Sequence, residues 1–145
     1  MSNSRISSAD AAMRITRRAV MRLLMAAFYL VAGVLHIVAP AGFVLIVPDA
    51  VPWPETTVMV TGLCEIAGAA GLMTKRLRRA AGIALAAYAV CVFPANIKHA
   101  LFTAPVAALP AGWWYHGPRL ALQPLLVWWA LYCAEVTDWP FGARR

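Results

Sequence analysis

Five polar side chains stand inside otherwise apolar segments and could do chemistry there: His36, Glu65, Asn96, Arg119 and Gln123. An imidazole, a carboxylate, a guanidinium and two amides can together hold a polar head group or exchange a proton. Within their apolar runs, four of the five lie toward the same end, and Glu65 lies just below them. We therefore treat them as one candidate polar pocket in the outer half of a membrane-embedded helical protein.

Glu65 is the most informative of these residues. It is the only charge in the run Thr56–Met73, which at about 1.5 Å per residue nearly spans a hydrocarbon core of roughly 30 Å. A carboxylate at that depth costs about 2.5–3.5 kcal/mol, so Glu65 must be protonated, paired, or face a polar cavity. Gly62, Gly68 and Ala69 share its helix face, which predicts that this face packs against a neighbouring helix.

Arg119 is the natural partner for Glu65, because a guanidinium matches carboxylate geometry and stays charged when buried. Their estimated depths differ by about two helical turns, so direct contact requires a deeper last helix or an inward-reaching arginine. A purely structural role, as a polar tie between helices, remains open for Glu65. His36 likewise is either a functional group or a hydrogen-bonded interface residue.

The composition indicates a membrane protein. The 145 residues are 62% hydrophobic and 13% charged, against about 25% charged in soluble domains. The net charge of +7 does not indicate nucleic-acid binding, because the basic residues stand in blocks beside apolar runs. The strongest block, TKRLRR at Thr74–Arg79, predicts a cytoplasmic loop, and with it a cytoplasmic N-terminus and C-terminus.

We predict an all-α fold, an integral membrane four-helix bundle. Its parts are a cytoplasmic N-terminal flank at 1–18, a domain at 19–136 with helices at about 19–39, 56–73, 80–102 and 118–136, and a cytoplasmic tail at 137–145. Pro94 and Pro124 predict bends.

The sequence also predicts where several residues outside the candidate pocket lie relative to the membrane. Arg22 and Lys98 should extend toward the head groups, and His99 should lie at the interface. The patch Phe43–Val47 should dip into the outer interface or cover the bundle, or else form an ordinary loop with a few buried apolar side chains.

No sequence motif for a metal site or for catalysis is present. His36 and His99 are of the residue type that ligates haem, but both lie near the outer end, which disfavours haem. Cys64, Cys91 and Cys133 fall in different apolar runs without a CxxC pair, which predicts small buried thiols rather than a disulfide framework.

A larger set of residues, in order and spacing, resembles the DoxX family of small bacterial membrane proteins. The set comprises His36 to Pro40, Phe43, Ile46 to Pro48, Pro52, Gly62, Glu65, Phe93 to Ile97, Arg119, Leu120 and Gln123. The resemblance implies a four-helix protein of the bacterial inner membrane. It also implies redox work, because the family takes its name from a subunit of a thiosulfate:quinone oxidoreductase.

Three functions follow as hypotheses. The first is a membrane subunit of a redox or quinone-linked system, with a quinone or a small sulfur species in the polar pocket and a redox protein as partner. The second is a non-enzymatic interaction or assembly module in the lipid bilayer. The third is transport of a small solute or proton, which four helices would support only as a homo-oligomer.

Overall fold

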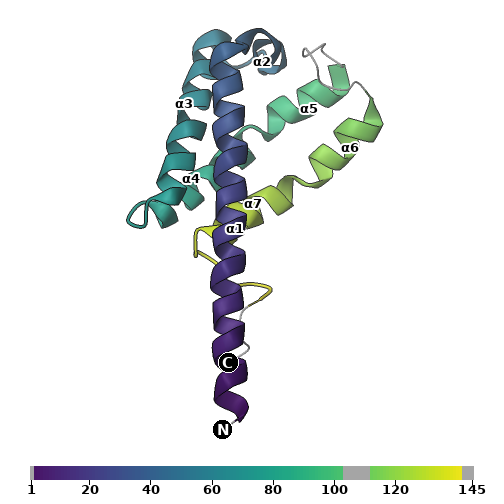
Figure 1. Cartoon of the computed structure of the whole chain (residues 1–145). Helices are drawn as coiled ribbons and strands as arrows, with labels where there is room; N and C mark the ends of the chain where they lie inside the picture. The colour runs from purple at the N-terminus through teal and green to yellow at the C-terminus, as the bar shows by residue number, and fades with distance from the viewer. Residues whose placement is uncertain (1, 103–111, 142–145) are drawn as a thin grey trace.

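In the computed structural model of the chain, residues 2–102 and 112–141 are described, and all their regular secondary structure is α-helical (Figure 1). The helices are α1 (Ser2–Val38), α2 (Pro40–Ile46), α3 (Pro54–Met73), α4 (Arg78–Cys91), α5 (Phe93–Phe102), α6 (Trp113–Ala121) and α7 (Gln123–Cys133).

Helix α1 is the long axis of the molecule in Figure 1. The polar residues at 1–18, predicted as a flank, continue the same helix from Ser2 onward. No glycine or proline precedes Gly33 in α1, so nothing in its sequence interrupts the backbone hydrogen bonds. Only the part from Arg17 to Val38 is apolar enough to cross a membrane.

Three helical stretches are long and apolar enough to cross a membrane: Arg17–Val38, Pro54–Met73 and Arg78–Phe102. The fourth stretch predicted, 118–136, is not among them. It lies in two short helices with a break at Leu122, and Arg119, Gln123 and two prolines make it less apolar than the other three. Pro124 follows that break as Pro94 follows the break at Val92 between α4 and α5. A proline has no N–H to donate and its ring crowds the preceding turn, which explains both breaks.

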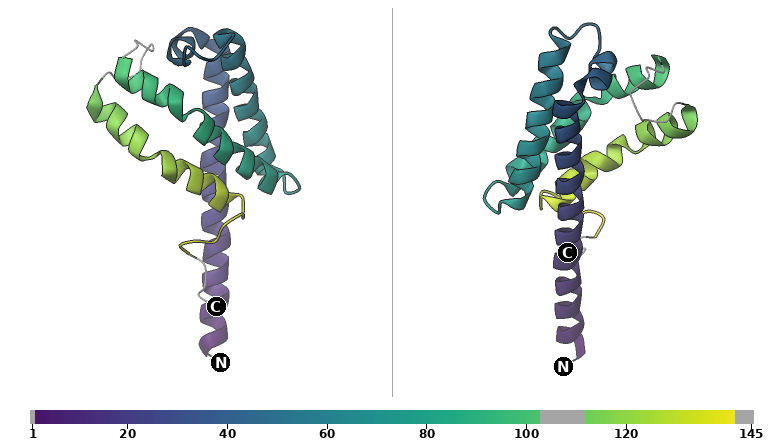
Figure 2. Two further views of the ribbon diagram at one scale, coloured as in Figure 1. Left: turned by 180° about the vertical axis from the view of Figure 1, so that it is seen from behind. Right: turned by 45° about the horizontal axis from the view of Figure 1, so that its top comes forward.

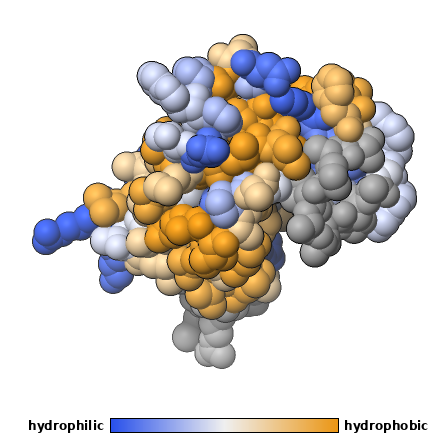
Figure 3. Space-filling view, turned by 90° about the horizontal axis from the view of Figure 1, so that it is seen from above, coloured by the Kyte–Doolittle hydropathy of each residue, from blue (hydrophilic) through white to orange (hydrophobic). Residues whose placement is uncertain are grey.

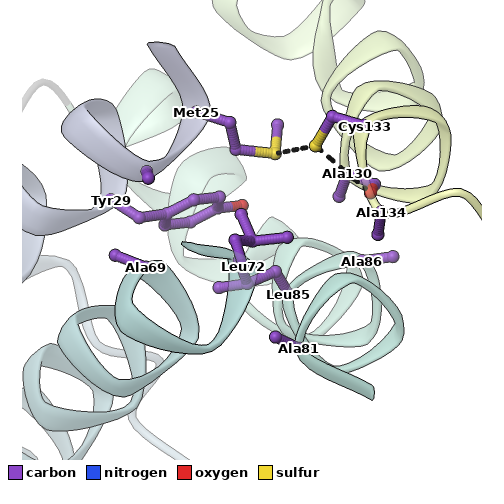
Figure 4. Close-up of a cluster of buried hydrophobic side chains, with 11 residues drawn as sticks. Met25, Tyr29, Ala69, Leu72, Ala81, Leu85, Ala86, Ala130, Cys133 and Ala134 are labelled. Carbon is purple, nitrogen blue, oxygen red and sulfur yellow. Dashed lines mark hydrogen bonds between the residues drawn. The ribbon is translucent and has the colours of Figure 1, made fainter. Parts of the chain in front are cut away.

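The core lies where α1, α3, α4 and α7 meet (Figure 4). Its large members, Met25, Tyr29, Leu72 and Leu85, are almost fully buried, and alanines between them let the helices approach closely. Cys133 donates its thiol to the sulfur of Met25 and to the carbonyl of Ala130. All three cysteines are free thiols, but only Cys133 is buried as predicted. Cys64 and Cys91 lie on outward helix faces and are exposed.

Glycine allows α1 and α3 to cross almost in contact. A Cβ added to Gly33 would lie 2.6 Å from the carbonyl oxygen of Gly62, and one added to Gly62 would lie 2.9 Å from the carbonyl oxygen of Gly33. The face of α3 that carries Gly62, Glu65, Gly68 and Ala69 is buried, as the spacing of its small residues predicts.

The end of the molecule that carries the basic α3–α4 turn is closed by ion pairs. Arg22 does not extend to the head groups as predicted. It is 9% exposed and donates to the Cys133 carbonyl and to Glu135, at 2.9 and 2.7 Å. Arg78 reaches the same carboxylate oxygen of Glu135 at 2.9 Å. Satisfied partners inside the protein outweigh snorkelling for Arg22.

At the opposite end, α2 covers the bundle, with Ile46 and Val47 buried. Lys98 of α5 donates to the carbonyl of Val47 and to the exposed Asp49, both at 2.6 Å. This contact ties α5 to the segment after α2.

Helices α5 and α6 lie side by side and lean away from α1 in every view (Figures 1 and 2). Seen from above, hydrophobic side chains form much of the surface, and hydrophilic ones gather toward its edges (Figure 3).

Candidate functional site

His36 and Glu65 form a buried pair across the α1–α3 crossing. Nδ1 of His36 lies 3.0 Å from Oε2 of Glu65, and only 5% of the Glu65 side chain is exposed. The same nitrogen lies 2.8 Å from the carbonyl oxygen of Ala32, toward which its proton is directed. Oε2 is therefore next to the imidazole but lacks a well-aligned hydrogen bond. Such a pair can hold its proton on either group.

Two tyrosines and a threonine complete the polar surroundings of Glu65. The Tyr88 hydroxyl of α4 is within hydrogen-bonding reach of Glu65 and of Thr61. The Tyr29 hydroxyl of α1 is buried without a partner, and its ring stands edge-on to that of Tyr88 at 6.1 Å. The Tyr29 hydroxyl and Oε2 of Glu65 can therefore each form a further hydrogen bond. Leaving a buried polar atom without a partner costs about 1–3 kcal/mol.

His36 also lines a depression of about 460 Å³ formed by α1, α2 and the start of α3. The other lining residues are mostly apolar: Ile37, Pro40, Ala41, Val44, Glu55 and Met59. On its other side, the imidazole stacks on Phe43 of α2, with ring centroids 4.0 Å apart. A ligand in this depression would meet one imidazole, backed by the buried carboxylate of Glu65, and the exposed carboxylate of Glu55, in an otherwise apolar wall.

The other three predicted residues lie together at a second place, between α5, α6 and α7. The amide of Asn96 donates to Gln123 at 3.3 Å, and Gln123 donates to the carbonyl of Ala89. Arg119 donates to the carbonyl of Asn96 at 3.3 Å and contacts Nδ1 of His99 at 3.1 Å.

The five candidate residues thus form two groups. The partner of Glu65 in the ion pair is His36, whereas the contacts of Arg119 described above are with α5, so the expected pairing of Glu65 with Arg119 is not the one observed. The backbone of Arg119 is in α6, which together with α5 leans away from α3 (Figure 2). The depth difference noted from the sequence is therefore not removed by the tertiary structure.

Two buried histidines, His99 and His116, also belong to the second group. His99, expected at the interface, is 2% exposed. His116 was not singled out and is equally buried, with its ring 4.7 Å from that of His99. Burial and the charge of Arg119 lower the pKa of His116. Its position three residues before Arg119, on the same helix face, is the signal that could have identified it.

Tyr88 and Tyr29 were missed for another reason. Both stand in strongly apolar runs, where a tyrosine is ordinarily a core residue with its hydroxyl paired. Nothing in the spacing of either residue indicates that its ring faces Glu65.

Within residues 2–102 and 112–141, no group of three or more His, Cys, Asp or Glu side chains is placed to hold a metal ion. The His36 depression, with its single imidazole, suits hydrogen bonding to an organic ligand better than metal coordination.

Comparison with known proteins corrects the expected family. No curated protein matches the chain. No solved structure matches it either. The resemblance to DoxX is wrong, because the family model that matches, over residues 25–134, is a different one. The residues quoted for DoxX are mostly prolines, small residues and single polar groups, which apolar helices acquire for packing reasons alone. The chain belongs to the family described as a domain of unknown function, DUF8561.

Proposed function

We propose that this protein is a multi-pass protein of the bacterial inner membrane that binds a small lipid-soluble carbonyl compound, with a quinone as the ligand class, against His36. The observation that carries the proposal is the position of His36. It lines the depression between α1, α2 and α3, while the buried carboxylate of Glu65 lies 3.0 Å from its ring.

The size and lining of the depression support this ligand class. Its volume of about 460 Å³ falls within the roughly 300–1,000 Å³ of small-molecule sites. A mostly apolar wall that presents an imidazole as its hydrogen-bond donor suits a ring that carries a carbonyl oxygen. An imidazole protonated on both nitrogens can donate to that oxygen, and Glu65 provides the counter-charge.

A role as the membrane subunit of a redox system extends this proposal. Reduction of a quinone consumes both electrons and protons. His36 and Glu65 would serve the protons only, so the electrons would come from a redox partner protein.

The four-helix topology, with both termini cytoplasmic, is part of the proposal. It is supported by the basic turn between α3 and α4, whose Lys75, Arg76 and Arg79 are exposed, and by Arg17 and Arg18 at the same end of α1. The broken helix formed by α6 and α7 would then provide the fourth crossing despite its break at Leu122.

The test is binding of a short-chain ubiquinone to the purified protein in maltoside micelles, measured by quenching of tryptophan fluorescence. His36→Gln should weaken binding about tenfold, because it removes the ring that donates to the carbonyl. Glu65→Gln should weaken it less, because only the counter-charge is lost. Glu55→Gln is the matched control: it makes the same chemical change on an exposed carboxylate of the same depression. Absence of binding by the wild type, or equal binding by all variants, would exclude the proposal.

A second candidate is a non-enzymatic membrane module, in which the polar pair only sets the register of two helices. The observation in its favour is that the His36–Glu65 pair lies directly beside the Gly33–Gly62 contact. In this case Glu65→Gln should lower the melting temperature, and the protein should bind no quinone. The two candidates are separated by measuring stability and quinone affinity on the same variants.

A further inference from the structure

The interface between α5 and α6 holds a cation that lacks a carboxylate partner. Arg119 contacts Nδ1 of His99, the carbonyl oxygen of Asn96 and the ring of Tyr115, whose centroid is 5.4 Å from its guanidinium carbon. All three partners are neutral, since Nδ1 of His99 must present its lone pair to the guanidinium. Nε of Arg119 is buried and donates to no atom.

The acidic residues of the chain are accounted for elsewhere. Of the six, four are in ion pairs: Asp49 with Lys98, Glu65 with His36, Glu135 with Arg22 and Arg78, and Asp138 with Arg18. The other two, Asp10 and Glu55, belong to the N-terminal half of α1 and the first turn of α3. Residues 103–111 contain no acidic residue. Among the residues that the structure describes, no acidic side chain is therefore left to neutralise Arg119, and an anion from another molecule could do so.

His116 adds a second unused group at the same place. It is 2% exposed, and neither of its ring nitrogens has a hydrogen-bond partner. Its ring stands edge-on to His99 at 4.7 Å and to Tyr115 at 5.1 Å. Because His116 and Arg119 are three residues apart in α6, their free N–H groups belong to the same helix face.

The depth of this cluster is indicated by the aromatic residues at the start of α6. Trp113 and Trp114 are exposed, at 64% and 72%, and exposed tryptophans of membrane proteins concentrate at the level of the lipid head groups. His116 follows within one turn of helix, so the cluster is at the level of the lipid phosphates.

We propose that His116 and Arg119 bind a phosphate oxyanion, held by Nε–H of Arg119 and a ring N–H of His116. Guanidinium and imidazole N–H groups are common donors to phosphate oxygens, and their hydrogen bonds to an anion are among the stronger ones in proteins. The oxyanion belongs either to a phospholipid head group or to a phosphate-bearing solute. The site is separate from the His36 depression and does not depend on the function proposed for it.

The experiment uses the full chain in maltoside micelles, which contain no phosphate. Short-chain phosphatidylglycerol, diacylglycerol of the same chain length and inorganic phosphate are titrated separately. Binding affinity and the ring nitrogen signals of His116 in NMR spectra are the two readouts. Arg119→Gln and His116→Phe remove the proposed donors, and Arg79→Gln removes an exposed charge next to the α3–α4 turn, away from the proposed site.

Two results support the site and distinguish its ligand. If the ligand is a lipid phosphate, phosphatidylglycerol should bind at least about tenfold more tightly than diacylglycerol. This preference should be lost in Arg119→Gln and in His116→Phe but kept in Arg79→Gln. A saturable shift of the His116 signals with inorganic phosphate alone indicates a solute. In either case the bound anion should raise the pKa of His116.

The proposal would be overturned if the His116 signals do not respond to phosphate and the lipids show no donor-dependent preference. The second condition is met when both lipids bind equally, or when the preference for phosphatidylglycerol survives in both donor variants. Should Arg119→Gln fail to fold, Arg119→Lys and His116→Phe carry the same test. Lysine keeps the charge but lacks the Nε donor. The affinity of Arg119→Lys for phosphatidylglycerol should therefore fall between those of the wild type and His116→Phe.

Discussion

Gly62 lies where the backbones of α1 and α3 come closest. A Cβ at this position would be 2.8 Å from Cβ of His36 and 2.9 Å from the carbonyl oxygen of Gly33. Neither of these atoms can move by a change of rotamer, so the helices themselves would have to separate. The distance between His36 and Glu65 depends on the same crossing, which links the packing of one glycine to the geometry of the candidate site.

Gly62→Ala should lower the free energy of unfolding by about 1–3 kcal/mol, because overpacking a close contact costs that much. Denaturation in mixed micelles followed by circular dichroism measures the change. Gly117→Ala is the matched control: a Cβ there meets no atom within 4 Å, so alanine should be neutral or stabilising. Equal stability of the two variants would mean that α1 and α3 do not cross at Gly62.

At the scale of the helices, Glu135 joins elements that are far apart in the sequence. Its carboxylate accepts from Arg22 of α1 and from Arg78 at the start of α4, and it follows directly after α7. Its backbone has a φ of 63°, which is unfavourable for a residue other than glycine, so the surrounding contacts must hold it there. The ion pairs therefore close the end of the bundle at the basic α3–α4 turn.

Glu135→Gln should destabilise the protein by about 1–2 kcal/mol, since two neighbouring arginines lose their common counter-charge while partial exposure of the carboxylate moderates the effect. Hydrogen exchange should quicken at the start of α4 and the end of α7, and the core of α3 should keep its protection. A uniform increase along the whole chain would instead indicate a global loss of stability without a local role for Glu135.

For the whole molecule, α6 and α7 decide how many times the chain crosses the membrane. Three other stretches are long and apolar enough, whereas α6 and α7 carry Arg119, Gln123 and two prolines around their break at Leu122. The contacts of α7 with α4 and α1 and the packing of the tail against Arg17 and Arg18 favour a fourth crossing. A fourth crossing would bring the tail to the side of the basic turn.

Single cysteines in a chain without Cys64, Cys91 and Cys133 should reveal the topology. A membrane-impermeant maleimide added to right-side-out vesicles should label Ala50→Cys but neither Lys75→Cys nor Phe141→Cys. In inverted vesicles the pattern should reverse. Labelling of Phe141→Cys together with Ala50→Cys would show that α6 and α7 do not cross.

The sequence by itself determined the local features. The apolar runs predicted α3 and most of α1 and α4, prolines predicted the breaks near Val92 and Leu122, and the small residues around Glu65 predicted the packed face of α3. These features follow from hydrogen bonding and side-chain size within one helix, which adjacent residues settle.

Only the tertiary structure decided which groups meet. Glu65 pairs with His36 rather than Arg119, Arg22 turns inward to Glu135, and His116 lies beside His99. Such pairings depend on the rotation and depth of each helix relative to its neighbours. Those are set by close contacts between different helices, such as Gly33 with Gly62, and the hydropathy of a single run contains no information about them.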